Sequence, residues 1–170
     1  MPSLVKFLPI LAIALLLTGC SHYHLGTGTK LSFRTLYIAP VENKAPVPQA
    51  RELVSTQLRE AFARDPRVTL ADSPETADAT LTVVLTEYRR EVASVREGDT
   101  GLARKFNLTL GATATLRDNR AAKNLFEKRL VSAVRESFTD SGQVQSEYQT
   151  LPLLADALAD KLTHAALDVW

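Results

Sequence analysis

The chain has 170 residues, of which 45% are hydrophobic, and it carries 20 basic against 19 acidic side chains. This near balance of charge argues against a nucleic-acid-binding protein, because such proteins concentrate positive charge on one face. The length and the apolar content suit a single domain with a hydrophobic core of its own.

An apolar segment opens the chain. Lys6 is its only charged residue, and the almost wholly apolar run over residues 7–17 is too short for a hydrocarbon core, which needs about 20 residues. The run has the size and flanks of a secretory signal peptide. Its end, Leu17-Thr18-Gly19-Cys20, resembles the lipobox of bacterial lipoproteins, whereas an ordinary signal peptide with an incidental cysteine is the alternative. The resemblance implies cleavage before Cys20 and acylation of that residue, which would anchor the protein to a membrane.

We therefore expect a signal peptide over residues 1–19, a lipidated tether over 20–34 and a single domain over 35–170. The mature chain then has 19 basic and 19 acidic side chains. Because Cys20 is the only cysteine, its acylation leaves no thiol for a disulfide, a cysteine nucleophile or a Cys-ligated metal site. His22 and His24 in the tether have no acidic partner nearby, which argues against a metal site there.

Hydrophobic periodicity predicts the element order β-α-β-β-β-α. The expected elements are a strand at 35–41, a helix at 49–64, a short extended piece within 67–70, long strands at 80–95, 106–116 and 125–138, and a last helix running to the C-terminus. Asp65-Pro66 ends the first helix. Thr150 is expected to cap the last helix, with Pro152 in its first turn, after a polar loop over 139–150.

The long strands predict a sheet with two different faces. Residues 106–116 alternate most cleanly, with Phe, Leu and Ala on one face and Asn, Thr and Gly on the other. Tyr88 is expected on the polar face, and Phe126 is expected to share a parity with Leu130, Val134 and Phe138. The fold class is thus α/β, a two-layer sandwich in which a mixed four-stranded sheet carries two helices on one face. A threonine-rich face is left uncovered.

The sequence contains no catalytic constellation. No GxSxG, HExxH or Walker pattern occurs, and the carboxylates are interleaved with Arg or Lys as on a solvated surface, so we expect neither an enzyme nor a cofactor. The hairpin between the first two long strands, with its loop over 96–103, is the charged feature that stands out as a candidate site. Arg96, Arg104 and Lys105 lie in or beside it and could pair with phosphates. Acidic side chains share this region, so a tip that simply stays soluble is the alternative.

Short stretches along the whole chain resemble the LptE family of lipopolysaccharide-assembly lipoproteins. Tyr23-His24-Leu25 follows Cys20, residues 34–41 read RTLYIAPV, residues 53–60 read LVSTQLRE, and Ala77-Asp78-Ala79 precedes the first long strand. The resemblance implies a non-enzymatic lipoprotein on the periplasmic side of the outer membrane. It would plug a β-barrel lipopolysaccharide-assembly protein (LptD-like), assist lipopolysaccharide assembly and bind lipopolysaccharide.

The resemblance also places Arg96 near a lipopolysaccharide-binding loop, and Arg104 and Lys105 are the expected companions. Residues 139–150 contain no Lys or Arg that would add a second basic side. One alternative is a generic periplasm-facing lipoprotein scaffold of another envelope complex. A second is an envelope hydrolase or small-ligand carrier, which would need a concave pocket with convergent polar groups.

Overall fold

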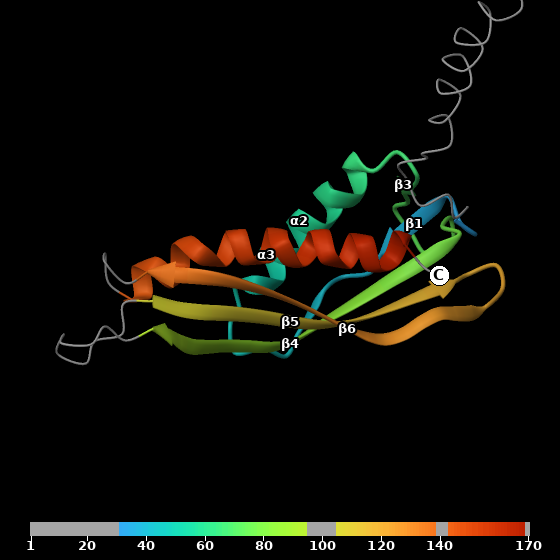
Figure 1. Ribbon diagram of the computed structural model, residues 1–170. Helices are drawn as coiled ribbons and strands as arrows, with labels where there is room; N and C mark the ends of the chain where they lie inside the picture. The colour runs from blue at the N-terminus through green and yellow to red at the C-terminus, as the bar shows by residue number, and fades with distance from the viewer. Residues whose placement is uncertain (1–30, 95–104, 139–142, 169–170) are drawn as a thin grey trace, which may run out of the picture. The chain divides into compact units, whose positions relative to one another are not determined.

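The computed structural model describes residues 31–94, 105–138 and 143–168. Within these ranges, two long helices lie on one side of a mixed sheet (Figure 1). The elements are β1 (Thr35–Ile38), β2 (Glu42–Asn43), α2 (Ala50–Arg64), β3 (Thr69–Leu70), β4 (Ala79–Ser94), β5 (Lys105–Asp118), β6 (Lys123–Phe138) and α3 (Gln143–Leu167). The predicted α/β class is confirmed. The two-residue strand β3 lies within the short extended piece expected at 67–70, and β2 is a further two-residue strand.

The sheet has the strand order β3-β1-β4-β5-β6, with β2 also paired to β4. β1 is parallel to both of its neighbours, whereas β4, β5 and β6 form an antiparallel meander. The chain passes from β1 to its parallel neighbour β4 through α2, the helical crossover that a parallel pair requires. β6 is therefore a long edge strand.

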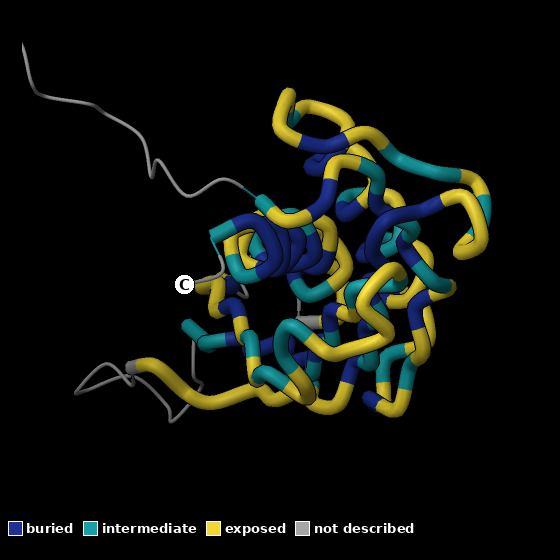
Figure 2. The backbone as a smooth tube through the Cα atoms, turned by 90° about the vertical axis from the view of Figure 1, so that its right-hand side faces the viewer, coloured by how far each residue is buried: buried dark blue, intermediate teal, exposed yellow. Residues whose placement is uncertain are grey.

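The apolar spacing of α2 explains both its formation and its position. Val54, Leu58 and Phe62 recur every four residues, so they lie on one stripe, and all three are 0% exposed. Asp65 leaves the helical conformation at the C-cap and is followed by Pro66, which cannot extend the helix. The stripe packs into a core between the helices and one face of the sheet, where the buried positions gather (Figure 2).

α3 begins earlier than the sequence predicts. It starts at Gln143, so Thr150 and Pro152 lie inside the helix, and the predicted cap at Thr150 is wrong. The Thr150 hydroxyl is buried and donates instead to the Ser146 carbonyl at 2.7 Å, and it lies 3.3 Å from the Ser137 hydroxyl of β6. Packing of these early turns on the sheet therefore outweighs the cost of a proline within a helix.

A partly buried tyrosine on β4 also holds the first turns of α3. The Tyr88 hydroxyl donates to Glu147 at 3.1 Å, and Arg90 forms an ion pair with the same carboxylate. Burial, together with the nearby Glu147 charge, raises the pKa of Tyr88 to about 12. Tyr88 thus stays a neutral donor at physiological pH.

These contacts require Tyr88 to lie on the helix side, which corrects the expectation that it lies on the polar face. The β4–β5 register shifts between Leu85 and Glu87, where a bulge adds one residue to β4. Because strand side chains alternate, the extra residue moves Tyr88 to the face opposite that of Thr82 and Val84.

A second irregularity corrects the expected parity of β6. The β5–β6 register shifts between Ala114 and Leu116, close to Lys128, whose φ is 46°. Phe126 pairs with buried Leu116 on the helix side, whereas Leu130 pairs with Thr113 on the other side. Phe126 therefore does not share a face with Leu130, Val134 and Phe138.

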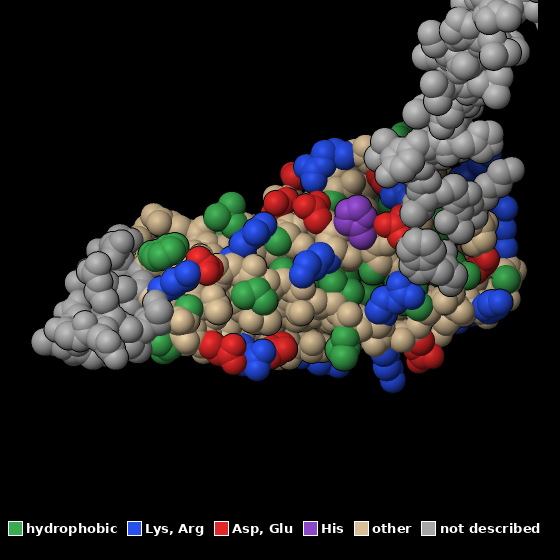
Figure 3. Space-filling model, viewed as in Figure 1, with side chains coloured by type: hydrophobic (Ala, Val, Ile, Leu, Met, Phe, Trp, Pro, Cys, Tyr) green, Lys and Arg blue, Asp and Glu red, His purple; other side chains and the backbone are tan. Residues whose placement is uncertain are grey.

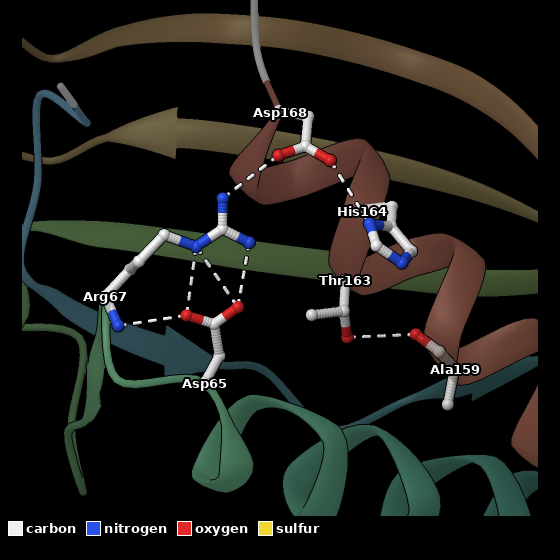
Figure 4. Close-up of polar contacts among 6 residues, drawn as sticks. All are labelled: Asp65, Arg67, Ala159, Thr163, His164 and Asp168. Atoms are coloured by element: carbon white, nitrogen blue, oxygen red, sulfur yellow. Dashed lines mark hydrogen bonds and ion pairs between the residues drawn. The ribbon is translucent and has the colours of Figure 1, made fainter. Parts of the chain in front are cut away.

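Arg67 ties the C-terminal end of α3 to the segment after α2 (Figure 4). Its guanidinium lies 2.8 Å from the Asp65 carboxylate and 3.0 Å from that of Asp168, which also contacts His164 at 3.1 Å. The side-chain hydrogen bonds from Arg67 lower the pKa values of both aspartates. The His164 side chain is itself exposed.

Candidate functional site: the open sheet face

The side of β4, β5 and β6 that faces away from the helices is the candidate site, which we call the open face. Three parallel rows of side chains form it, as the strand register shows. The rows are Glu87, Arg89 and Glu91 on β4, beyond the bulge that follows Thr82 and Val84 on the same side; Asn107, Thr109, Gly111, Thr113 and Thr115 on β5; and Leu130, Ser132, Val134, Glu136 and Phe138 on β6. The rows lie on long strands of 14 to 16 residues.

The β4 row is a short ladder of charges. Arg89 lies between Glu87 and Glu91, at 3.2 Å and 3.4 Å from their carboxylates. All three side chains are about half exposed, so each pair contributes less than about 1 kcal/mol to stability. The ladder keeps this margin of the open face hydrated and polar, with two carboxylates against one guanidinium.

The β5 row is less accessible than an uncovered threonine face would be. Thr109 is only 6% exposed, because it lies between its cross-strand neighbours Arg89 and Val134. Gly111 is also buried, and a Cβ at this position would lie 3.2 Å from the Cβ of Glu87. The glycine thus leaves room where the β4 bulge crowds the sheet. Thr113 and Thr115 remain partly exposed.

The β6 row is the most distinctive part of the open face, because it places large apolar side chains in solvent. Leu130 is 80% exposed, Val134 51% and Phe138 54%. Ser132 and Glu136 alternate with them along the strand. A row of exposed apolar side chains with polar neighbours is typical of a surface that another molecule covers.

β6 is an edge strand, and a lysine covers part of its free edge. The Lys161 ammonium of α3 donates to the Ser132 carbonyl at 2.7 Å. Charged side chains on an edge strand oppose pairing with further strands. The open face, rather than the free edge of β6, is therefore the better surface for a specific contact.

Of the residues that the sequence predicts for binding, the structure describes only Lys105. Cys20, Arg96 and Arg104 lie outside the described residues. Lys105 lies 2.6 Å from the Glu136 carboxylate, and its ammonium lies 5.7 Å from the centre of the Phe138 ring. It thus joins β5 to β6 at one end of the open face. The role of the three basic residues in lipopolysaccharide binding stays a prediction.

The sequence does not predict the apolar β6 row of the candidate site. Its pattern shows that Leu130, Val134 and Phe138 share one side of the strand, but it does not show that this side faces away from the helices. Alternate residues of β6 also include Val131 and Ala133, so hydrophobicity alone does not tell which set faces the helices. The decision depends on the irregularity near Lys128, which periodicity does not reveal.

A shallow depression of about 730 Å³ lies apart from this face, beside β2 and the start of α2. Its polar lining comes from Glu42, Asn43, Lys44 and Arg51. Among the described residues, no group of three or more His, Cys, Asp or Glu could hold a metal ion. None of the described helices is both long and apolar enough to cross a membrane.

A helix-backed sheet with one bare and partly apolar face defines a class of domain that presents a binding surface. Comparison with protein families then identifies the group. The family model described as "LptE: Lipopolysaccharide-assembly" matches residues 33–165, and the chain belongs to this family. This membership associates the chain with lipopolysaccharide assembly and with a family of non-catalytic lipoproteins.

Solved structures show the same fold at low sequence identity. A minor lipoprotein from Acinetobacter baumannii has a TM-score of 0.51 and 19% identity, with 79% of this chain and 92% of that chain covered. The rare lipoprotein B from Shewanella oneidensis has a TM-score of 0.50 and 12% identity, with 78% and 92% covered. Lipoprotein B from Nitrosomonas europaea has a TM-score of 0.53 and 18% identity, with 84% and 86% covered. A comparison with curated protein sequences gives no match.

Proposed function

We propose that this chain is an outer-membrane lipoprotein that docks its open face against the β-barrel of the lipopolysaccharide translocon, plugs that barrel and assists lipopolysaccharide assembly at the cell surface. Acylated Cys20 anchors it on the periplasmic side of the outer membrane. The role is non-enzymatic and needs no cofactor. Membership of the lipopolysaccharide-assembly family supports the process.

The observation that carries the proposal is the exposed apolar row of β6 beside the polar rows of β4 and β5. Leu130 and Phe138 are large apolar side chains, and leaving them in water forgoes the roughly 25 cal/mol per Å² that burial contributes. The rest of the face offers hydroxyl, amide and ion-paired groups. These polar groups suit the polar interior wall of an outer-membrane barrel, and the apolar β6 row needs apolar side chains on that wall to cover it.

The lengths of the elements favour the same arrangement. β4 and β6 have 16 residues each, which span roughly 50 Å at about 3.3 Å per residue. α3 has 25 residues and spans roughly 37 Å. The sheet is therefore longer than the helix that covers it, and it offers more surface than its own core requires.

Co-purification from a mild-detergent extract tests the docking. Changing Leu130 and Val134 together to Asp should abolish recovery of the barrel with the tagged protein, because two charges would face its wall. The matched control changes Val144 and Leu153 of α3 to Asp, since both are exposed apolar residues outside the open face. Equal recovery of the barrel with both variants, or no barrel with the wild type, would contradict the proposal.

The anchor has a separate test. Cys20→Ala should abolish acylation and processing at residue 20, and mass spectrometry of the wild type should find an acylated N-terminus at Cys20. A mature wild-type chain that begins at another residue would refute the lipoprotein assignment, whatever the barrel experiment shows.

Lipopolysaccharide binding is proposed for Arg96, Arg104 and Lys105. Changing all three to Glu should weaken lipopolysaccharide capture in a pull-down, because phosphate groups would then meet negative charge. The control changes three other exposed basic residues to Glu. These are Lys44 just after β2, Arg51 at the start of α2 and Arg135 on β6. Capture that is unchanged by the first triple variant would remove these residues as a binding site.

A further inference from the structure

A group of exposed basic side chains surrounds the turn between β5 and β6. We call this group the basic end, and it consists of Arg34, Arg117, Arg120, Lys123 and Lys128, all of which are exposed. Residues 117–129 contain five basic and two acidic side chains, although the whole chain has a net charge of only +1. The turn therefore carries a local excess of positive charge that the composition conceals.

Most of these cations are not neutralised by a neighbour. Among the described residues, Arg34, Arg117, Lys123 and Lys128 form no ion pair, and only Arg120 does so, with Asp78. Toward the other end of the strands, two of the described cations do have acidic partners. Arg90 pairs with Glu147 there, and Lys105 pairs with Glu136.

Asp78 fixes the start of the domain beside this turn. Its carboxylate accepts the backbone N–H groups of Arg34 at 2.8 Å and of Thr35 at 3.1 Å, and it also binds the Arg120 guanidinium at 2.6 Å. The point at which the chain enters β1 and the β5–β6 turn therefore meet at one aspartate. The blue start of β1 and the β5–β6 turn accordingly lie at the same end of the sheet (Figure 1).

We propose that the basic end is a docking surface for a membrane that carries anionic phospholipid headgroups, namely the membrane that holds the Cys20 anchor. This inference rests on the lipid anchor of the proposed function. The 14 residues from Cys20 to Arg34 reach at most about 50 Å, so the anchor confines the domain close to the membrane. Because Arg34 enters β1 beside these cations, an anchor attached through the preceding residues would hold this end of the domain toward the membrane.

The positive charge of the basic end indicates an anionic partner. Exposed Lys and Arg side chains near an anionic bilayer are attracted to its phosphates, and the attraction falls off within a Debye length of about 8–10 Å at moderate salt. On the face of the molecule drawn in Figure 3, Lys and Arg side chains are interspersed with Asp and Glu side chains. The turn segment has two carboxylates of its own, Asp118 and Glu127. Asp72 and Glu75 lie on the loop between β3 and β4, whose Pro74 carbonyl accepts a hydrogen bond from Asn119 of the turn. They oppose docking, and their removal should strengthen it.

Vesicle sedimentation tests this surface without the anchor. The protein is the chain from residue 20 onward with Cys20→Ser, which keeps every described element within the compact unit Leu31–Trp170. Its probes are phosphatidylcholine vesicles with and without phosphatidylglycerol, at low and high NaCl. The basic-end variant carries Arg117→Gln, Lys123→Gln and Lys128→Gln. The matched control removes the same number of charges through Lys44→Gln, Arg51→Gln and Arg135→Gln.

We expect binding to the anionic vesicles only, with loss at high salt. The basic-end variant should bind roughly tenfold or more weakly, the control variant should bind nearly as the wild type does, and Asp72→Asn with Glu75→Gln should bind more tightly. Circular dichroism establishes that each variant is folded. No binding of the wild type, or equal weakening in both triple variants, would overturn the proposal.

Competition with inorganic phosphate distinguishes docking to a lipid surface from binding of the free anion at a site. Phosphate should displace the protein no better than NaCl does at equal ionic strength, whereas stronger displacement would overturn docking to a surface. Neither arm uses the barrel or the acyl chains. A failure here would therefore leave the co-purification test of the open face untouched, and failure of that test would not alter the vesicle result.

Discussion

At the scale of single residues, a few buried or strained positions fix how the strands meet. Asp78 is 9% exposed and joins the start of β1, the start of β4 and the β5–β6 turn through its carboxylate. Hydrogen bonds from the backbone N–H groups of Arg34 and Thr35 lower its pKa below the ordinary value. Ala122 in the same turn has a φ of 51°, a conformation that favours glycine.

Asp78→Asn should reduce the free energy of unfolding at neutral pH by about 2 kcal/mol, because hydrogen bonds to a charged acceptor become bonds to a neutral one. A carboxyl whose pKa is lower in the folded state stabilises the protein above the unfolded pKa of about 4. This stabilisation is lost as the pH falls through the lower, folded value. The difference between variant and wild type in urea unfolding should therefore shrink in acid. Asp72→Asn, at an exposed residue, should stay within about 0.5 kcal/mol. An equal loss at neutral and acidic pH would contradict the role of the charge.

Ala122→Gly should raise the free energy of unfolding by roughly 0.5–1 kcal/mol, because glycine adopts a positive φ without the clash of a Cβ. Ala121→Gly is the matched control, since this adjacent turn residue has no positive φ. It should lower the stability through the greater entropy of the unfolded chain. The melting temperatures of the two variants, each compared with the wild type, test this prediction. Shifts of the same sign would contradict the turn geometry.

At the scale of elements, periodicity predicts the α2 helix and the long strands well, because each has many residues in one hydrophobic pattern. The alternation over residues 106–116 predicts the correct two faces, as the burial of Leu108, Leu110 and Leu116 confirms. The errors follow from interactions that no local pattern contains. The bulge after Leu85 moves Tyr88 to the helix side, and the contacts of Tyr88 with Glu147 hold turns of α3 that the sequence assigns to a loop.

Pro152→Ala distinguishes an α3 helix that begins at Gln143 from one that begins after Thr150. In a helix that begins at Gln143, Pro152 removes a backbone hydrogen bond and crowds the carbonyl of Tyr148, so alanine should stabilise the protein by about 1 kcal/mol or more. In a helix that began after Thr150, proline would occupy a favourable first-turn position, and alanine would bring no gain. Urea unfolding decides between these outcomes, and a loss of stability would contradict the continuous helix.

At the scale of the whole domain, the fold separates two surfaces for which we propose different partners. The open face combines a polar ladder with the apolar β6 row, and it is proposed to bind the barrel. The basic end lies beside the start of β1 and is proposed to bind phospholipid headgroups. The sequence predicts that one sheet face is bare, because two amphipathic helices need only one face. It does not predict which apolar side chains lie on the bare face, since that depends on the irregularity in β6.

Site-specific photocrosslinking in cells is the most direct test of the open face. A photoreactive residue at Ser132 is exposed on this face between Leu130 and Val134, whereas one at Thr56 is exposed on α2, on the opposite side of the sheet. We expect Ser132 to capture the β-barrel of the lipopolysaccharide translocon, identified by mass spectrometry, and Thr56 to capture far less of it. Capture of the barrel from Thr56 as readily as from Ser132, or no capture from Ser132, would contradict the assignment of the open face as the docking surface.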